Sequence, residues 1–148
     1  MTALDLSNPA LALSFLPTML SVIQLPPSEP IPTELVAILA GQGEEQAFVS
    51  LTRTPAETSV VLPTPLFERL YPSPPPALET SGPWVALQVA GPMDFSLSGI
   101  LNALTTPLKE AQIPIFAMST WNTDYVLVDE KHKERTKEVL SEARWKFP

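Results

Sequence analysis

The sequence predicts an α+β protein built from two small units, each with a ferredoxin-like order of strands and helices. Three observations support this fold class. The chain has 148 residues, enough for one sizeable core or two small ones. It is 45% hydrophobic and 17% charged, which is too apolar and too weakly charged for a disordered chain. A proline-rich stretch near the middle separates two segments in which strand and helix patterns alternate.

The proline-rich stretch sets the predicted domain boundaries. The chain contains 18 prolines, well above the usual share, and four of them fall between Pro72 and Pro76. Such a run favours an extended linker. We therefore expect a first unit at 1–71, a linker at 72–83 and a second unit at 84–148.

The second unit begins with a strand and a helix. Residues 84–90 are nearly all apolar, as in a strand that is covered on at least one face. Residues 91–94 form a turn, and Asp94 or Ser96 is placed to cap the helix that follows. The helix begins near Ser96, and its apolar residues recur at helical spacing along one stripe: Leu97, Ile100, Leu101, Leu104, Leu108 and Ala111.

A hairpin and a charged helix complete the second unit. Residues 113–119 and 124–128 read as strands, with a turn at Trp121-Asn122-Thr123 between them. A helix then runs from Asp129 to about Ala143. The order βαββα needs one more strand to complete a ferredoxin-like sheet.

The first unit follows the same order more weakly. Strand patterns cover 19–25, 47–52 and 59–62, and helical patterns cover 33–40 and 66–71. A spare apolar segment, 11–16, precedes them. Because the second unit ends without its last strand, we expect residues 11–16 to pair with the second sheet.

The uncharged stretch from Leu6 to Ser28 raises the question of a membrane span. Polar residues and Pro17, Pro26 and Pro27 interrupt it, and the first basic residue of the chain is Arg53. A membrane span is more uniformly apolar, and a signal peptide carries basic residues at its start. We therefore expect a protein of the cytoplasm that does not insert into membranes.

Composition excludes several kinds of chemistry. The chain has no cysteine, which rules out disulfides and thiolate chemistry, and its one histidine, His132, cannot build a multi-histidine metal centre. The formal charge of −7 argues against a nucleic-acid surface. The glycines of 91–99 lack the spacing and the lysine of a phosphate-binding loop. We expect no catalytic residues, no cofactor and no metal.

Asp94 and Asp124 are the most suggestive acidic residues. Asp94 precedes a predicted helix, and Asp124 stands where the hairpin turn meets its second strand. As structural residues they would be a helix cap and a turn residue. As a ligand site, the helix N-terminus would attract a carboxylate and a nearby aspartate would bind an ammonium group. The spacing alone leaves both interpretations open.

Two motifs of the second unit carry a resemblance to a known family. The segment Gly-Pro-Met-Asp-Phe-Ser-Leu-Ser-Gly-Ile at 91–100 and the segment Ser-Thr-Trp-Asn-Thr-Asp-Tyr-Val-Leu-Val at 119–128 resemble those of small tandem ACT-domain proteins. The cytosolic arginine sensors of animals are distant relatives of that group. Residues 48–61 are similar to the matching segment of the family's first repeat, with Glu57-Thr58-Ser59 where Glu-Leu-Ser is usual.

The resemblance implies two ACT-type βαββαβ units packed side by side. It also implies a regulatory sensor that holds a small molecule, such as an amino acid, between the units and has no catalytic activity. The matched ligand-binding positions are Ser59, Val60, Gly91, Pro92, Met93, Asp94, Phe95, Thr120, Trp121 and Asp124. A protein partner or a second copy of the chain is a further expectation. The alternative is a structural or protein-interaction module that has the fold but binds no ligand.

Overall fold

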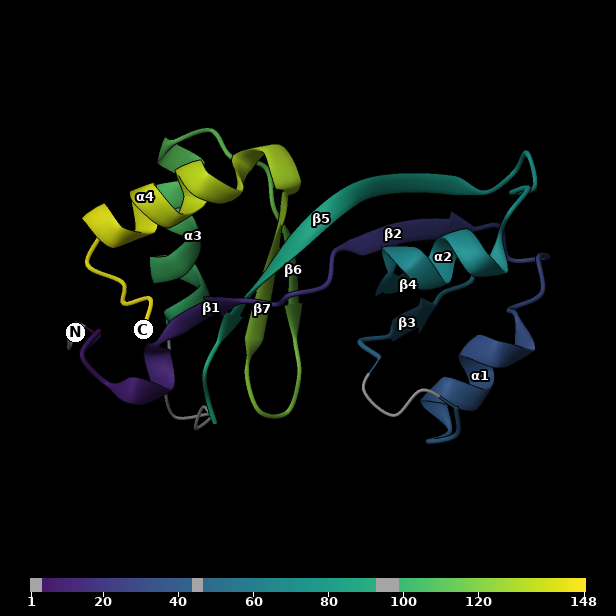
Figure 1. Ribbon diagram of the computed structural model, residues 1–148, viewed down its shortest axis with the longest axis horizontal. Helices are drawn as coiled ribbons and strands as arrows, with labels where there is room; N and C mark the ends of the chain where they lie inside the picture. Colours follow the sequence, from purple (N-terminus) through teal and green to yellow (C-terminus); the bar gives the residue numbers. More distant parts are fainter. Residues whose placement is uncertain (1–3, 44–46, 93–98) are drawn as a thin grey trace. The chain divides into compact units, whose positions relative to one another are not determined.

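The computed structural model describes residues 4–43, 47–92 and 99–148 (Figure 1). Its contacts divide the chain into two compact units. One, here the terminal unit, contains residues 1–17 and 85–148; the other, here the middle unit, contains residues 18–84. No helix in the described ranges combines the length and the apolar character that a membrane crossing requires.

In its described residues the middle unit has four antiparallel strands, the first part of β5 included, and two helices. Its elements are β2 (Leu20–Leu25), α1 (Thr33–Leu39), β3 (Ser50–Arg53), β4 (Thr58–Pro63), α2 (Thr64–Leu70) and the first part of β5 (Glu79–Val89). The strands lie in the order β3-β4-β2-β5. Alternate residues of β2 and β4 pack with Leu35 of α1 and Leu66 of α2 in one buried cluster. Both helices therefore cover the same face of this sheet.

The terminal unit repeats the same order with one strand taken from the N-terminus. Its elements are η1 (Pro9–Leu11), β1 (Leu13–Phe15), the rest of β5, α3 (Ile100–Glu110), β6 (Phe116–Ser119), β7 (Asp124–Asp129), η2 (Glu130–His132) and α4 (Lys133–Glu142). The strand order is β1-β5-β7-β6. The α+β class with an antiparallel sheet is the fold that the sequence predicted.

Strand β1 takes the place of the missing last strand of the terminal unit. Leu13, Ser14 and Phe15 pair antiparallel with Val89, Gln88 and Leu87 of β5. This is the pairing that the sequence analysis expected for the spare segment at 11–16, although Leu11 itself belongs to η1. The physical reason is that β1 has apolar side chains to bury and the sheet has an edge that would otherwise be open.

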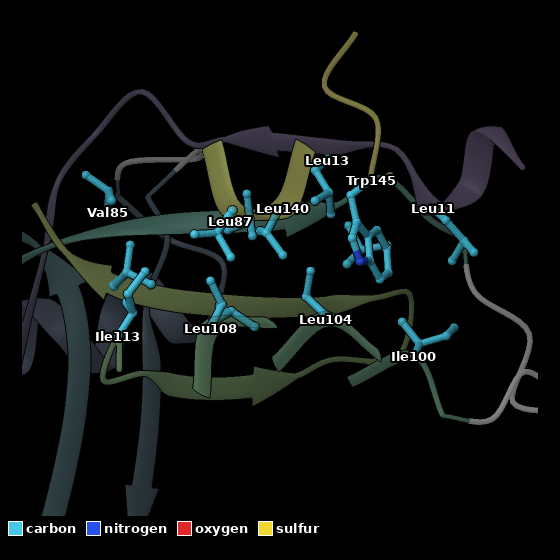
Figure 2. Packing of buried hydrophobic residues seen from close by; sticks show 14 residues of the cluster. Leu11, Leu13, Val85, Leu87, Ile100, Leu104, Leu108, Ile113, Leu140 and Trp145 are labelled. Carbon is cyan, nitrogen blue, oxygen red and sulfur yellow. The ribbon is translucent and has the colours of Figure 1, made fainter. Parts of the chain in front are cut away.

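The core of the terminal unit lies between its helices and one face of its sheet (Figure 2). Leu104 and Leu108 of α3 and Leu140 of α4 are fully buried there against Leu87 of β5. Trp145, which follows α4, is only 3% exposed and joins the same cluster. The C-terminal segment is therefore part of this core.

The structure differs from the predicted linker at 72–83, because residues 79–83 belong to β5. Leu20 pairs with Trp84, but Val22 pairs with Ser81, so β5 has one extra residue in a bulge at Gly82-Pro83. The sequence analysis places Gly82 and Pro83 at the end of the predicted linker. In the structure they occupy a bulge, where a strand tolerates both.

The start of α3 is also later than predicted. The helix begins at Ile100, and its N-cap is Gly99 in the left-handed conformation, without a side-chain cap. The expected start at Ser96 is therefore wrong. Asp94 and Ser96, the expected caps, lie outside the described residues. Apolar periodicity does not reveal this boundary, because a glycine in the left-handed conformation precedes the helix without disturbing the pattern.

The bulge gives a prediction about Gly82. Its φ is +138°, and a Cβ there would lie 3.2 Å from the carbonyl oxygen of Leu20 and 3.1 Å from Trp84 Cδ1. Such a conformation costs a non-glycine residue on the order of 1–3 kcal/mol. We expect Gly82→Ala to lower the free energy of unfolding by at least that amount in a urea titration.

Gly41→Ala is the matched control for this experiment. Gly41 also has a positive φ, +83°, but its Cβ would meet nothing within 4 Å. The free energy of unfolding of Gly41→Ala should fall only by what the left-handed conformation costs an alanine, roughly 1–2 kcal/mol. Equal losses from the two variants would contradict the close approach at the bulge.

Candidate ligand site at the β6–β7 hairpin

The hairpin between β6 and β7 is held by its own turn. The Thr120 N–H donates to the Thr123 carbonyl oxygen at 2.8 Å, and the Thr123 N–H donates to Thr120 Oγ1 at 3.3 Å. Trp121 and Asn122 form the tip, and the Trp121 side chain is 81% exposed. The turn thus fixes the register that places Ser119 opposite Asp124.

Asp124 is a buried acidic residue. It is 8% exposed, and its Oδ1 accepts a hydrogen bond from Ser119 Oγ at 2.5 Å. A hydroxyl that donates to a carboxylate makes a strong hydrogen bond. Burial of an anion is costly unless it is paired, so this position suits a cationic group of a ligand.

Thr123 connects the hairpin to the end of β5. It is 4% exposed, and its hydroxyl donates to the carbonyl oxygen of Val89 at 2.5 Å. Val89 is the last residue of β5 and stands two residues before Gly91. The hydrogen bond therefore fixes the start of β7, where Asp124 lies, beside the start of the segment between β5 and α3.

The predicted loop at 91–95 is described only at its beginning. Gly91 has a φ of +63°, and its N–H donates to the carbonyl oxygen of Ala10 at 2.9 Å. Pro92 has no N–H. Neither residue thus has a backbone N–H left to donate to a ligand. Their place in the ligand site stays a prediction. Met93, Asp94 and Phe95 lie outside the described residues.

Ser59 and Val60 lie in the other compact unit, on strand β4. Val60 is fully buried in the core of the middle unit, and its backbone pairs with Ile23 on one side and Leu51 on the other. Ser59 is half-buried and pairs with Gln24 and Thr52. The structure thus brings Thr120, Trp121 and Asp124 together on one hairpin. A contribution from Ser59 and Val60 stays a prediction.

Two residues of this cluster, Ser119 and Thr123, were absent from the predicted set. Both had been assigned to the hairpin, but their contacts depend on the cross-strand register and on the position of β5. A spacing of five residues across a short turn is the signal that could have identified Ser119 as the neighbour of Asp124. Within the described ranges, no group of three or more His, Cys, Asp or Glu side chains could hold a metal ion.

Comparison with known proteins supports an ACT-like fold. Residues 79–142 match the family model of the ACT domain, a range that begins with β5 and ends with α4. None of the curated proteins matches the sequence. The relation to arginine sensors stays a prediction.

Solved structures match nearly the whole chain. Protein Atu0741 from Agrobacterium tumefaciens is 29% identical, with a TM-score of 0.71 over 93% of this chain and 91% of its own. The aspartokinase alpha and beta subunits are 17% identical, with a TM-score of 0.63 over 89% and 96%. The ligand-free regulatory subunit of aspartate kinase from Thermus thermophilus is 11% identical, with a TM-score of 0.61 over 89% and 97%. The two kinase comparisons show the fold alone.

The Thr123 hydrogen bond gives a prediction about stability. Thr123→Val keeps the shape but leaves the Val89 carbonyl without this donor in a buried position, which costs about 1–3 kcal/mol. We expect a loss of that size in the free energy of unfolding, measured by denaturant titration.

Thr106→Val is the control, because Thr106 also donates its hydroxyl to a carbonyl, that of Asn102, but at an exposed helix position. There water can replace the lost donor, so the change in stability should be small. If Thr123→Val were as harmless as the control, the hydrogen bond to β5 would not hold the hairpin.

Proposed function

We propose that this protein is a regulatory, non-catalytic protein that binds a free amino acid at the β6–β7 hairpin of the terminal unit. Two comparisons support the proposal. The family model of the ACT domain matches the region that contains the hairpin. One protein of similar fold is the regulatory subunit of aspartate kinase from Thermus thermophilus. Its name describes a regulatory role for that protein.

The observation that carries the proposal is the buried carboxylate of Asp124. One of its oxygens accepts from Ser119 Oγ, which orients the carboxylate in the hairpin. An α-ammonium group supplies the charge and the N–H donors that a buried aspartate requires. The ligand would therefore place its ammonium at Asp124.

The carboxylate of the ligand needs donors of its own. Gly91 and Pro92 have none to offer, so we assign this role to backbone N–H groups of residues 93–95. The formal charge of −7 adds a mild preference for ligands with a neutral or cationic side chain. Salt screens this long-range effect strongly, so the contacts at Asp124 decide the affinity.

Regulation requires that the occupied and empty states differ in what they bind. The tip of the hairpin, Trp121 and Asn122, and the neighbouring Thr120 are exposed, and they are close to the proposed ammonium site along the chain. A downstream protein that contacts this tip would respond to occupancy of Asp124. In the alternative function, a protein-interaction module, the same tip would act without a ligand.

Calorimetric titration with each of the twenty protein amino acids tests the proposal. We expect at least one to bind the wild type, and Asp124→Ala to lose about 2–5 kcal/mol of its binding free energy because the ammonium loses its counter-charge. Asp124→Asn, which keeps an oxygen able to accept from Ser119, should lose a similar amount.

Asp129→Asn is the control, since Asp129 lies at the far end of β7 and its carboxylate accepts from the Lys131 N–H. It should bind as the wild type does. Absence of binding by the wild type would favour the interaction module. Equal binding by wild type and Asp124→Ala would remove Asp124 from the site.

A further inference from the structure

A proline-rich loop joins α2 to β5 in the middle unit. It contains residues 71–78, and the chain turns back in an open bend between the two elements (Figure 1). Pro72, Ser73, Pro74 and Pro76 are exposed, and Pro75 is half-buried. The proposed ligand site at Asp124 does not use this loop, so its exposed prolines have no role so far.

Residues of the core hold both ends of the loop. Tyr71 packs against the core of the middle unit, and the centroid of its ring is 5.8 Å from that of Phe67. Leu78 belongs to the same core and is 8% exposed. The Leu78 N–H donates to the carbonyl oxygen of Pro75 at 3.0 Å, which makes Pro76 the second residue of a turn, a position that favours proline. The loop is therefore anchored at both ends.

The sequence of the loop restricts its backbone. The ring of proline fixes φ at about −65°, and a residue that precedes proline is kept out of the helical region. Ser73, Pro74 and Pro75 each stand directly before a proline. Both constraints act on Pro74 and Pro75 and favour the polyproline II conformation there. A segment that already has this conformation loses little entropy when a partner binds it.

The loop presents apolar rings and carbonyl oxygens but few donors, because proline has no N–H. Within the described ranges, no backbone N–H donates to the carbonyl oxygens of Pro72, Ser73 or Pro74. Domains that recognise polyproline II use grooves lined with aromatic side chains. Aromatic rings pack on proline rings there, and the polar ends of Tyr and Trp donate to carbonyl oxygens. The groups that the loop exposes are those that such a groove binds.

A second proline-rich connection lies at the same end of the middle unit. Residues 26–32 follow β2, and Gln24 of β2 pairs with Glu79 at the start of β5. This connection contains four prolines, of which Pro27 and Pro30 are exposed. With the four between Pro72 and Pro76, eight of the 18 prolines of the chain are at this end. The loop is thus part of a wider surface that is rich in proline.

Acidic residues flank the loop along the chain. Glu68 precedes it, Glu79 follows it, and both are exposed. Arg69 also precedes it, but its guanidinium is paired with the carboxylate of Glu34 at 2.6 Å. A groove with basic residues at its rim therefore complements the charge beside the loop, whereas an acidic rim would be repelled.

We propose that this loop is a docking site for a protein domain that binds polyproline II segments in an aromatic groove with a basic rim. The exposed rings of Pro72 and Pro74 enter the groove, and the carbonyl oxygens beside them accept hydrogen bonds from it. The anchors at Tyr71 and Leu78 hold the loop in place before binding, which reduces the entropy that binding costs. The proposal does not depend on a ligand at Asp124.

Titration of the ¹⁵N-labelled full chain with purified SH3, WW and EVH1 domains, each with basic residues at the rim of its groove, tests the docking site. We expect at least one domain to bind and to shift the amide resonances of Ser73, Ala77 and Leu78. The double variant Pro72→Ala, Pro74→Ala should bind that domain about tenfold more weakly or worse, because it lacks both rings and its backbone is less restricted.

The double variant Pro55→Ala, Pro114→Ala is the matched control, since both prolines are exposed and neither has a proline beside it. It should bind as the wild type does. Circular dichroism of each variant verifies that it is folded. Absence of binding by all three classes of domain would overturn the proposal. So would shifts confined to residues outside 68–79, unchanged binding by Pro72→Ala, Pro74→Ala, or an equal loss in the control.

Discussion

Strand β5 is the element on which both compact units depend. Its residues Glu79 to Trp84 pair with β2 in the middle unit, and Leu87 to Val89 pair with β1 in the terminal unit. The bulge at Gly82 shifts the register within the pairing with β2, between Ser81 and Trp84. The candidate site follows from the end of β5, because the Val89 carbonyl accepts the Thr123 hydroxyl that holds the hairpin beside it. The position of Asp124 is thus a consequence of where β5 ends.

The terminal unit is also closed by both ends of the chain. Leu13 donates its N–H to Lys146, and the ring of Phe15 stacks on that of Phe147 with centroids 5.8 Å apart. The ammonium groups of Lys133 and Lys137 lie over these two rings. In the same N-terminal segment, the carbonyl oxygen of Ala10 accepts a hydrogen bond from the Gly91 N–H. This hydrogen bond positions the first residue of the predicted ligand loop. The core and the candidate site therefore use residues that are distant in the sequence.

Much of the fold could be predicted because apolar periodicity reports which residues are buried. The α+β class, the hairpin and the apolar face of α3 were predicted from it. The pattern failed where the backbone conformation of glycine or proline decided the structure, as at Gly99 and at Gly82-Pro83. Asp124 was identified as a candidate from its place at the turn and from the resemblance. Its partners Ser119 and Thr123, and the use of the Gly91 N–H by Ala10, depend on contacts between strands that no single segment encodes.

NMR observes directly whether an amino acid binds at the hairpin of the terminal unit. Amide resonances of the ¹⁵N-labelled protein would be followed while a mixture of the twenty protein amino acids is added. We expect concentration-dependent shifts at Ser119, Thr123 and Asp124, and at Gly91 beside the end of β5. A spectrum that does not change, or changes confined to residues 18–84, would contradict it.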